Sequence, residues 1–242
     1  VCGLLALLTC ASAQDWVKTG TGLGVEKIRI AVPEFKGSNQ DPRNPELLKI
    51  FNDTLSNDLS NAGIFEMVSK SFYPLGEVGQ PSDVKFDAWS APPPNAAMLV
   101  FGNLGSSGNN VTVQGWLYDV KNPTTPQVLA KQYTDAAVSK AVRVIAHKFA
   151  DEIIFRLGGG INGIAETSIY YVSSRGGHKE IWAMDYDGAD QHPITTLGTI
   201  SLSPHISPDG SRLAFSSFNG SAWEIRMFSL DLNRLISFPR YG

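Results

Sequence analysis

The chain has 242 residues, of which 43% are hydrophobic and 18% are charged, and its formal net charge at pH 7 is -3. This composition is typical of a globular protein with enough apolar residues for more than one core. The slightly acidic balance and the lack of any Lys or Arg run argue against nucleic acid as a partner. Twenty-three glycines and fourteen prolines indicate many turns, and therefore a β-rich portion.

The first residues have the pattern of an export signal. The apolar run Leu4–Leu8 is too short to span a bilayer, and small residues at 11–13 follow it, as a signal peptidase requires. We therefore expect residues 1–13 to be part of a signal peptide and the mature protein not to be inserted in a membrane; a buried apolar element is the alternative. Cleavage would remove Cys2 and Cys10, the only cysteines. The threonine before Cys10 fits a lipidation signal poorly.

Residues 14–26 are predicted to form a flexible N-terminal arm. The segment is rich in Gly and Thr and has no apolar periodicity, and its alternating glycines do not complete a dinucleotide-binding fingerprint. It holds one large aromatic residue, Trp16, which has no core to enter. An isolated aromatic in a polar arm is typical of a segment that recognises a partner, and a disordered tail is the alternative.

Residues 27–157 are predicted to form one small α/β domain, with two helices against a mixed sheet. The expected helices are Glu46–Asn61 and Val138–Leu157, the expected strands begin near Ile28, Ala97, Asn109 and Pro126, and the region between Tyr73 and Pro94 is expected to be a loop. A triple glycine opens the linker predicted over 158–168. After it, residues 169–242 hold only short β segments separated by turn residues.

This last part of the chain repeats. Ser173 aligns with Ser216 and Glu180 with Glu224, an offset of 43 to 44 residues. That period is typical of the four-stranded blade of a β-propeller; two chance-similar hairpins of a sandwich are the alternative. The strands of the second repeat are expected at Ser203–Ser207, Arg212–Ser217, Trp223–Leu230 and Arg234–Phe238, with a type I turn at Ser207–Gly210.

No catalytic, cofactor-binding or metal-binding residues are predicted. There is no G-x-S-x-G motif, and the four histidines show no metal-ligand spacing. His147 and Asp151, four apart on the last predicted helix, are interpreted as a surface pair. Asp185, Asp187 and Asp190 surround an Asp-Gly dipeptide and are interpreted as a turn between blade strands, not as a calcium site. Three aromatic residues are expected to pack between neighbouring blades: Trp182, Phe215 and Trp223.

Six short motifs occur in a distinctive order: IRIAVPEF (28–35), DAWS (87–90), IYYVSS (169–174), DYDGADQ (185–191), SPHISPDGSRLAF (203–215) and ISFPRYG (236–242). With the export signal, the α/β domain and the blade repeat, they make the chain similar to the TolB family, a periplasmic component of Tol-Pal systems. The family propeller has six blades, so the resemblance implies a sequence truncated at both ends that holds about two of them. The chain departs from the family pattern at Ala91–Pro94, where a Gly-containing turn is usual, and at Tyr241, where His is frequent.

The resemblance implies a monomeric periplasmic scaffold without cofactor, and not an enzyme. Such a scaffold links a TolA-like inner-membrane protein to Pal, the peptidoglycan-associated lipoprotein, and supports outer-membrane integrity, constriction during cell division and bacteriocin import. The expected contact residues are Asp15, Trp16, Val17 and Lys18 in the arm for the TolA-like protein, and Arg240 and Tyr241 in the propeller for Pal. The alternative is an exported propeller-containing serine hydrolase whose catalytic domain lies beyond this sequence.

Overall fold

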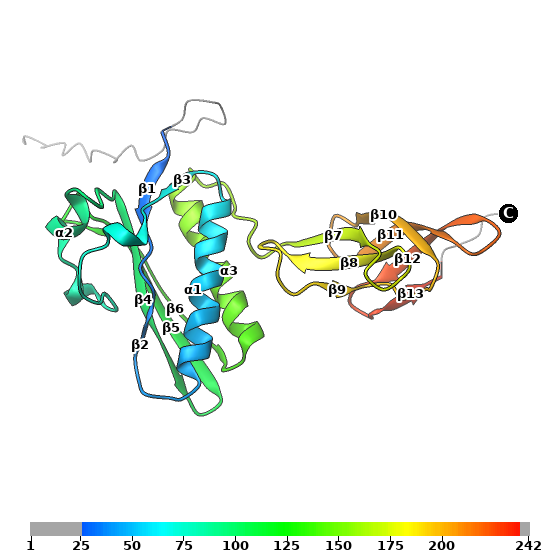
Figure 1. The fold of residues 1–242 in the computed structure, drawn as a ribbon, viewed down its shortest axis with the longest axis horizontal. Coiled ribbons are helices and arrows are strands. Elements are labelled where there is room, and N and C mark those ends of the chain that lie inside the picture. The colour runs from blue at the N-terminus through cyan, green and yellow to red at the C-terminus, as the bar shows by residue number, and fades with distance from the viewer. Residues whose placement is uncertain (1–25, 238–242) are drawn as a thin grey trace, which may run out of the picture.

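The computed structural model describes residues 26–237, which form an α/β unit followed along the chain by two small β-sheets (Figure 1). The expected signal peptide and nearly all of the expected arm lie outside the described residues, as do the expected contact residues at 15–18 and 240–241. Within residues 26–237, every helix is too short or too polar to cross a bilayer.

The α/β unit is built on a mixed six-stranded sheet. Its strands are β1 (Ile28–Ala31), β2 (Lys36–Gly37), β3 (Phe65–Met67), β4 (Met98–Ser107), β5 (Asn110–Asp119) and β6 (Gln127–Ala136). The strand order is β3-β1-β4-β5-β6, and β2 also pairs with β4. Strand β1 runs parallel to β3 and β4, whereas β4, β5 and β6 form an antiparallel meander. The predicted mixed sheet is therefore confirmed.

Two long helices, α1 (Asn44–Asn61) and α3 (Ser139–Leu157), lie side by side on one face of this sheet (Figure 1). Their apolar residues recur every three or four positions and are fully or nearly fully buried: Leu47, Phe51, Leu55 and Leu59 on α1, and Val142, Ile145, Phe149 and Ile153 on α3. The Phe149 ring rests on β5 at Gly115, where a Cβ atom would lie only 2.6 Å from the ring. Glycine is therefore required at this position for the helix to reach the sheet.

The region expected to be a loop between Tyr73 and Pro94 contains a short helix, α2 (Phe86–Ser90). The prediction was wrong here because five residues are too few to show helical periodicity. The side chain of Trp89 anchors the segment, since it is buried in a second core on the opposite face of the sheet from α1 and α3. The α/β unit is thus covered on both faces of its sheet.

The second unit contains two antiparallel sheets (Figure 1). The first is made of β7 (Ser168–Ser173), β8 (Glu180–Asp185) and β9 (His192–Pro193), and the second of β10 (Ile200–Ile206), β11 (Arg212–Phe218), β12 (Trp223–Ser229) and β13 (Arg234–Ile236). The four strands expected in the second repeat are all present and are hydrogen-bonded in chain order, as in a propeller blade. The Ser207–Gly210 turn is closed by the Gly210 N–H donating to the Ser207 carbonyl at 2.9 Å.

The two sheets repeat with a single spacing. Val172 pairs with Ile181 in the first sheet and Ser216 pairs with Ile225 in the second, so both strands are related by 44 residues (216 − 172 and 225 − 181). The alignment predicted from sequence was therefore one residue out of step on β7 and β11. Because side chains alternate between the two faces of a strand, a shift of one residue in the alignment assigns every side chain of the strand to the wrong face.

The corrected spacing explains which aromatic residues lie between the sheets. Phe215 packs there, as predicted, in a core with Ile181, Leu213 and Phe228. Trp182 is next to Ile181 on β8 and therefore faces away, with the Arg175 guanidinium 5.7 Å from its ring centroid. Trp223 is 54% exposed and packs on Phe218 of its own hairpin. Of the three predicted aromatic residues, Phe215 therefore packs between the two described sheets, whereas Trp182 and Trp223 lie on the outward faces of these sheets.

Candidate interdomain site

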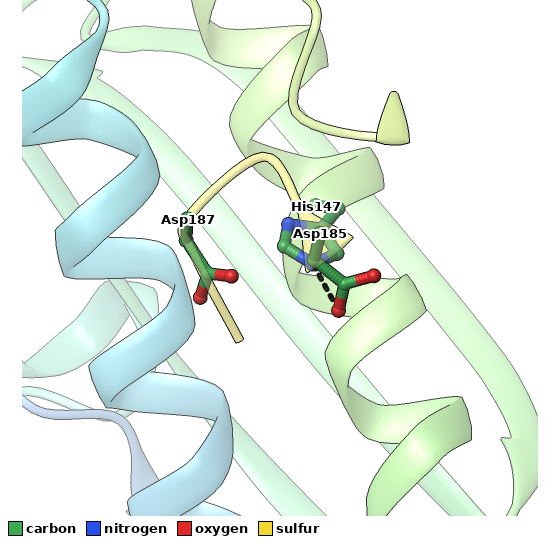
Figure 2. Close-up of side chains that lie close together, drawn as sticks. All are labelled: His147, Asp185 and Asp187. Atoms are coloured by element: carbon green, nitrogen blue, oxygen red, sulfur yellow. Dashed lines mark ion pairs between the residues drawn. The ribbon is translucent and has the colours of Figure 1, made fainter. Parts of the chain in front are cut away.

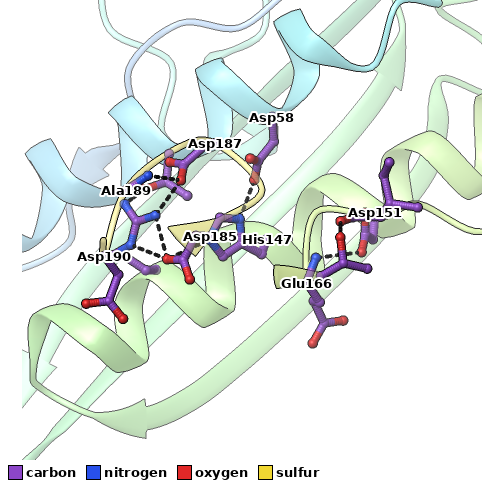
Figure 3. Close-up of polar contacts among 12 residues, drawn as sticks. Asp58, His147, Asp151, Glu166, Asp185, Asp187, Ala189 and Asp190 are labelled. Atoms are coloured by element: carbon purple, nitrogen blue, oxygen red, sulfur yellow. Dashed lines mark hydrogen bonds and ion pairs between the residues drawn. The ribbon is translucent and has the colours of Figure 1, made fainter. Parts of the chain in front are cut away.

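Helix α3 presents three polar side chains at intervals of four residues, Arg143, His147 and Asp151. Residues four apart lie on one face of a helix, and this face meets the turn between β8 and β9 and the segment that precedes β7 (Figure 3). The row therefore lies where the α/β unit contacts the first blade sheet. We call this contact the interdomain seam.

The turn on the blade side of the seam follows β8. The Gly188 N–H donates to the Asp185 carbonyl at 2.9 Å, and Gly188 has a φ of +84°. The Asp185 N–H donates to the Ala189 carbonyl at 2.9 Å, which closes the turn. The predicted Asp-Gly turn is confirmed, and its carboxylates point toward α3 (Figure 3).

Arg143 binds both carboxylates of this turn. Its Nη2 donates to Asp185 Oδ2 at 2.9 Å and to Asp187 Oδ1 at 2.7 Å, and its Nη1 donates to the Thr54 hydroxyl on α1 at 3.0 Å. The Asp187 side chain is only 3% exposed. Burial disfavours the charge of Arg143, but its hydrogen bonds to the two carboxylates raise the pKa of the guanidinium above its ordinary value. One cation thus joins α1, α3 and the blade turn.

His147 is buried beside Arg143 and pairs with a carboxylate on α1. Its Nδ1 lies 2.7 Å from Asp58 Oδ2, and the Asp58 side chain is completely buried. Burial opposes the charge of the imidazole, but the hydrogen bond and the charge of Asp58 outweigh it and raise the pKa of His147. The predicted surface pair with Asp151 was therefore wrong. Asp58 lies 89 residues away in sequence, so local spacing could not reveal this partner.

Asp151 holds the chain that leads into the first blade. Its carboxylate accepts the backbone N–H groups of Ala165 at 2.9 Å and Glu166 at 3.3 Å. Gly163 allows this approach, because a Cβ atom there would lie 1.9 Å from Asp151 Oδ1. The segment is therefore fixed to α3 by backbone hydrogen bonds and close packing.

Tyr186, which stands between Asp185 and Asp187 in the sequence, also contacts the α/β unit. Its ring packs against the core of the α/β unit, and its hydroxyl donates to the Asn61 carbonyl at the end of α1 at 3.2 Å. A cavity of about 390 Å³ lies beside these contacts and is lined by both units, including Lys140, Arg143, His147, Glu166 and Asp185. Polar, ionic and apolar contacts thus all connect the two units.

The architecture on either side of the seam matches one known family. Residues 21–125 match the family model described as the TolB amino-terminal domain. These residues belong to the TolB amino-terminal domain family. Curated relatives extend the similarity into the blade sheets. The Tol-Pal system protein TolB of Actinobacillus succinogenes is 32% identical over 231 residues, which cover 94% of this chain and 52% of the relative.

Further relatives agree with this assignment. The Tol-Pal system protein TolB of Cereibacter sphaeroides strain ATCC 17029 is 30% identical over 215 residues, covering 87% of this chain and 46% of the relative. The crystal structure of TolB from Acinetobacter baumannii matches with a TM-score of 0.69 at 21% identity, over 88% of this chain and 49% of that one. The chain spans about half the length of the curated relatives it matches. The TolB-like fold, with a mixed-sheet domain followed by propeller-type sheets, is thereby shown.

The seam of this TolB relative was missed from the sequence, although its parts were noticed. The Asp-Gly turn and the His147–Asp151 spacing were both recognised, but each was interpreted on its own. The sequence does contain a signal for the seam. Thr54 and Asp58 are polar residues four apart on α1, and the polar row on α3 has the same spacing, so each helix carries a polar face beside its apolar one. Such rows are usually solvent-facing, so the sequence favoured the wrong interpretation.

Proposed function

We propose that this chain acts as the TolB scaffold of a Tol-Pal system in the periplasm, and that its role is binding and not catalysis. The observation that carries the proposal is a TolB amino-terminal domain followed by blade-type sheets in the same order as in TolB proteins. Its partners are a TolA-like inner-membrane protein and the lipoprotein Pal. Through them it supports outer-membrane integrity, constriction during division and bacteriocin import.

The two partners bind at separate places in this proposal. The N-terminal arm, with Asp15, Trp16, Val17 and Lys18, binds the TolA-like protein, for instance by adding an extended strand to a sheet edge. The propeller binds Pal near Arg240 and Tyr241. The interdomain seam supports such a scaffold, because its hydrogen bonds and ion pairs connect the α/β unit, which follows the arm in sequence, to the first blade sheet.

Capture by purified partners tests the proposal. The TolA-like and Pal-like proteins encoded in the same genome are immobilised separately and incubated with the chain or with a version that lacks residues 14–24. We expect the deletion to abolish capture by the TolA-like protein and to preserve capture by Pal and the circular dichroism of the α/β unit. A chain that neither protein retains contradicts the proposed function.

Single substitutions sharpen the assignment of each site. Trp16→Ala should weaken capture by the TolA-like protein, with Trp223→Ala as the matched control because Trp223 is also a largely exposed tryptophan. Arg240→Glu should weaken capture by Pal, with Arg234→Glu on exposed β13 as the control. Equal effects of a substitution and its control would remove that residue from the site.

A further inference from the structure

The interdomain seam holds more negative than positive charge. Three carboxylates, those of Asp58, Asp185 and Asp187, lie near one permanently charged cation, Arg143, and the titratable His147, and two of the three are almost completely buried. Burying unbalanced charge is costly, so such a cluster stabilises any additional cation that fits within it. The position of His147 shows where that cation can bind.

His147 is held in the orientation of a metal ligand. Asp58 fixes its Nδ1 side at 2.7 Å, and its Nε2 is buried without a hydrogen-bond partner among the described residues. Figure 2 shows the imidazole facing Asp185, whose Oδ2 lies 3.8 Å from Nε2. A carboxylate that orients a histidine while its other nitrogen faces a ligand set is the usual outer shell of a protein-bound zinc ion.

The distances also suit a bound ion. At 3.8 Å, Nε2 and the carboxylate are too far apart for a hydrogen bond. Zinc bonds of ~2.0–2.2 Å place two ligands about 3.4 Å apart at a tetrahedral angle, so a small movement of Asp185 is sufficient. Asp187 supplies a third oxygen, and one ligand atom from each residue lies within 4.8 Å of the others. Arg143 donates to Asp185 Oδ2, the oxygen that faces Nε2, and to Asp187 Oδ1. A bound ion therefore shares Asp185 Oδ2 with the guanidinium or takes the second oxygen of each carboxylate.

We propose that His147, Asp185 and Asp187 bind a divalent transition-metal ion of the zinc type at the interdomain seam. An imidazole nitrogen with two carboxylates favours such an ion over calcium or magnesium, which prefer oxygen ligands alone. One ligand comes from α3 and two come from the blade turn, so the ion fixes the α/β unit to the first blade. The site does not depend on the Tol-Pal role proposed above.

Cobalt absorption tests the site directly. The chain without a histidine tag is freed of metal by a chelator, exchanged into chelator-free buffer and titrated with Co²⁺, whose visible absorption is strong only when few ligands surround the ion. We expect saturation at one equivalent and displacement of the absorption by one equivalent of Zn²⁺. Weak absorption that does not saturate, or no absorption, overturns the proposal.

Matched variants locate the ion. His147→Gln and Asp185→Asn should each weaken Co²⁺ binding at least tenfold, whereas His178→Gln, at an exposed histidine away from the seam, should not. Circular dichroism confirms that each variant is folded. Should the buried His147 substitution unfold the chain, Asp185→Asn still decides the question, because the Asp185 side chain is 30% exposed. Unchanged binding by Asp185→Asn places the ion elsewhere and overturns the proposal.

Discussion

At the scale of single residues, Asp209 organises the hairpin turn of the second blade sheet. Its carboxylate accepts the hydroxyl of Ser207 and both the N–H and the hydroxyl of Ser211. These donors favour the charged form and lower the pKa of Asp209 from 3.8 to about 2, the Ser207 hydroxyl being the largest cause. The Pro and Gly of the turn set its backbone, while Asp209 connects its two sides.

The first prediction concerns the titration of this carboxylate. A lowered pKa in the folded state means that the contribution of Asp209 to stability is present above pH 3.8 and is lost as the pH falls through about 2. We expect the NMR signal of the Asp209 carboxyl carbon to titrate near 2, and Ser211→Ala to move that midpoint toward 3.8. Ser221→Ala, in the next turn, should leave it unchanged. A wild-type midpoint at 3.8 would contradict the turn geometry.

A second residue-scale prediction concerns Gly115. Its replacement by alanine places a methyl group 2.6 Å from the Phe149 ring, so α3 and β5 must separate. We expect Gly115→Ala to lower the free energy of unfolding by about 1–3 kcal/mol, the usual cost of overpacking a core. Gly176→Ala is the control, because a methyl group added there would have no atom of another residue within 4 Å. Equal denaturant midpoints for the two variants would show that the core accommodates the group.

At the scale of elements, α3 has two functions on two faces. Its apolar stripe binds the sheet, and its row of Arg143, His147 and Asp151 binds the blade turn and the segment before β7. The seam therefore depends on the orientation of one helix about its own axis. A helix with the same apolar stripe but without the polar row would keep its apolar contacts with the sheet and lose its hydrogen bonds and ion pairs to the blade turn and to the segment before β7.

The element-scale prediction tests this row through the turn that it binds. Asp187→Asn removes a buried negative charge that Arg143 contacts at 2.7 Å, and we expect it to cost about 1–3 kcal/mol because a charged hydrogen bond is weakened in a buried site. Asp190→Asn, in the same turn but 55% exposed at its side chain, is the control. Both variants are compared by chemical denaturation and by the rate of tryptic cleavage between the units. Indistinguishable results would show that the seam contributes little to the contact.

At the scale of the whole molecule, the two blade sheets pack against each other through faces that are opposite in the repeat. Ile181 of the first sheet packs on Phe215 of the second, and the residue equivalent to Ile181 in the 44-residue repeat is Ile225, which is 62% exposed. The outer face of the second sheet thus repeats the chemistry of a surface that already packs against a blade. This is the behaviour of a repeat architecture, in which each unit is completed by its neighbour.

The whole-molecule prediction concerns hydrogen exchange. Among the described strands, β7 pairs only with β8, whereas β5 is flanked by β4 and β6. We expect the amides of β5 and of α3 to exchange slowly and those of Ile169–Ser173 to exchange much faster, because one edge of β7 has no backbone partner within residues 26–237. Mass spectrometry after deuterium labelling measures both in one sample. Equal protection of β5 and β7 would contradict the prediction.

The sequence by itself determined the features that depend on neighbouring residues. Apolar spacing placed α1 and α3, the Ser207–Gly210 turn located the second blade hairpin, and the order of the motifs predicted the TolB family. The tertiary structure decided the environment of His147, the direction of Trp182 and the existence of the interdomain seam. Their physical cause is distance along the chain: Arg143 meets Asp185 across 42 residues and His147 meets Asp58 across 89. Local patterns show that a helix face is polar, but only the packing of distant segments decides whether water or another carboxylate covers it.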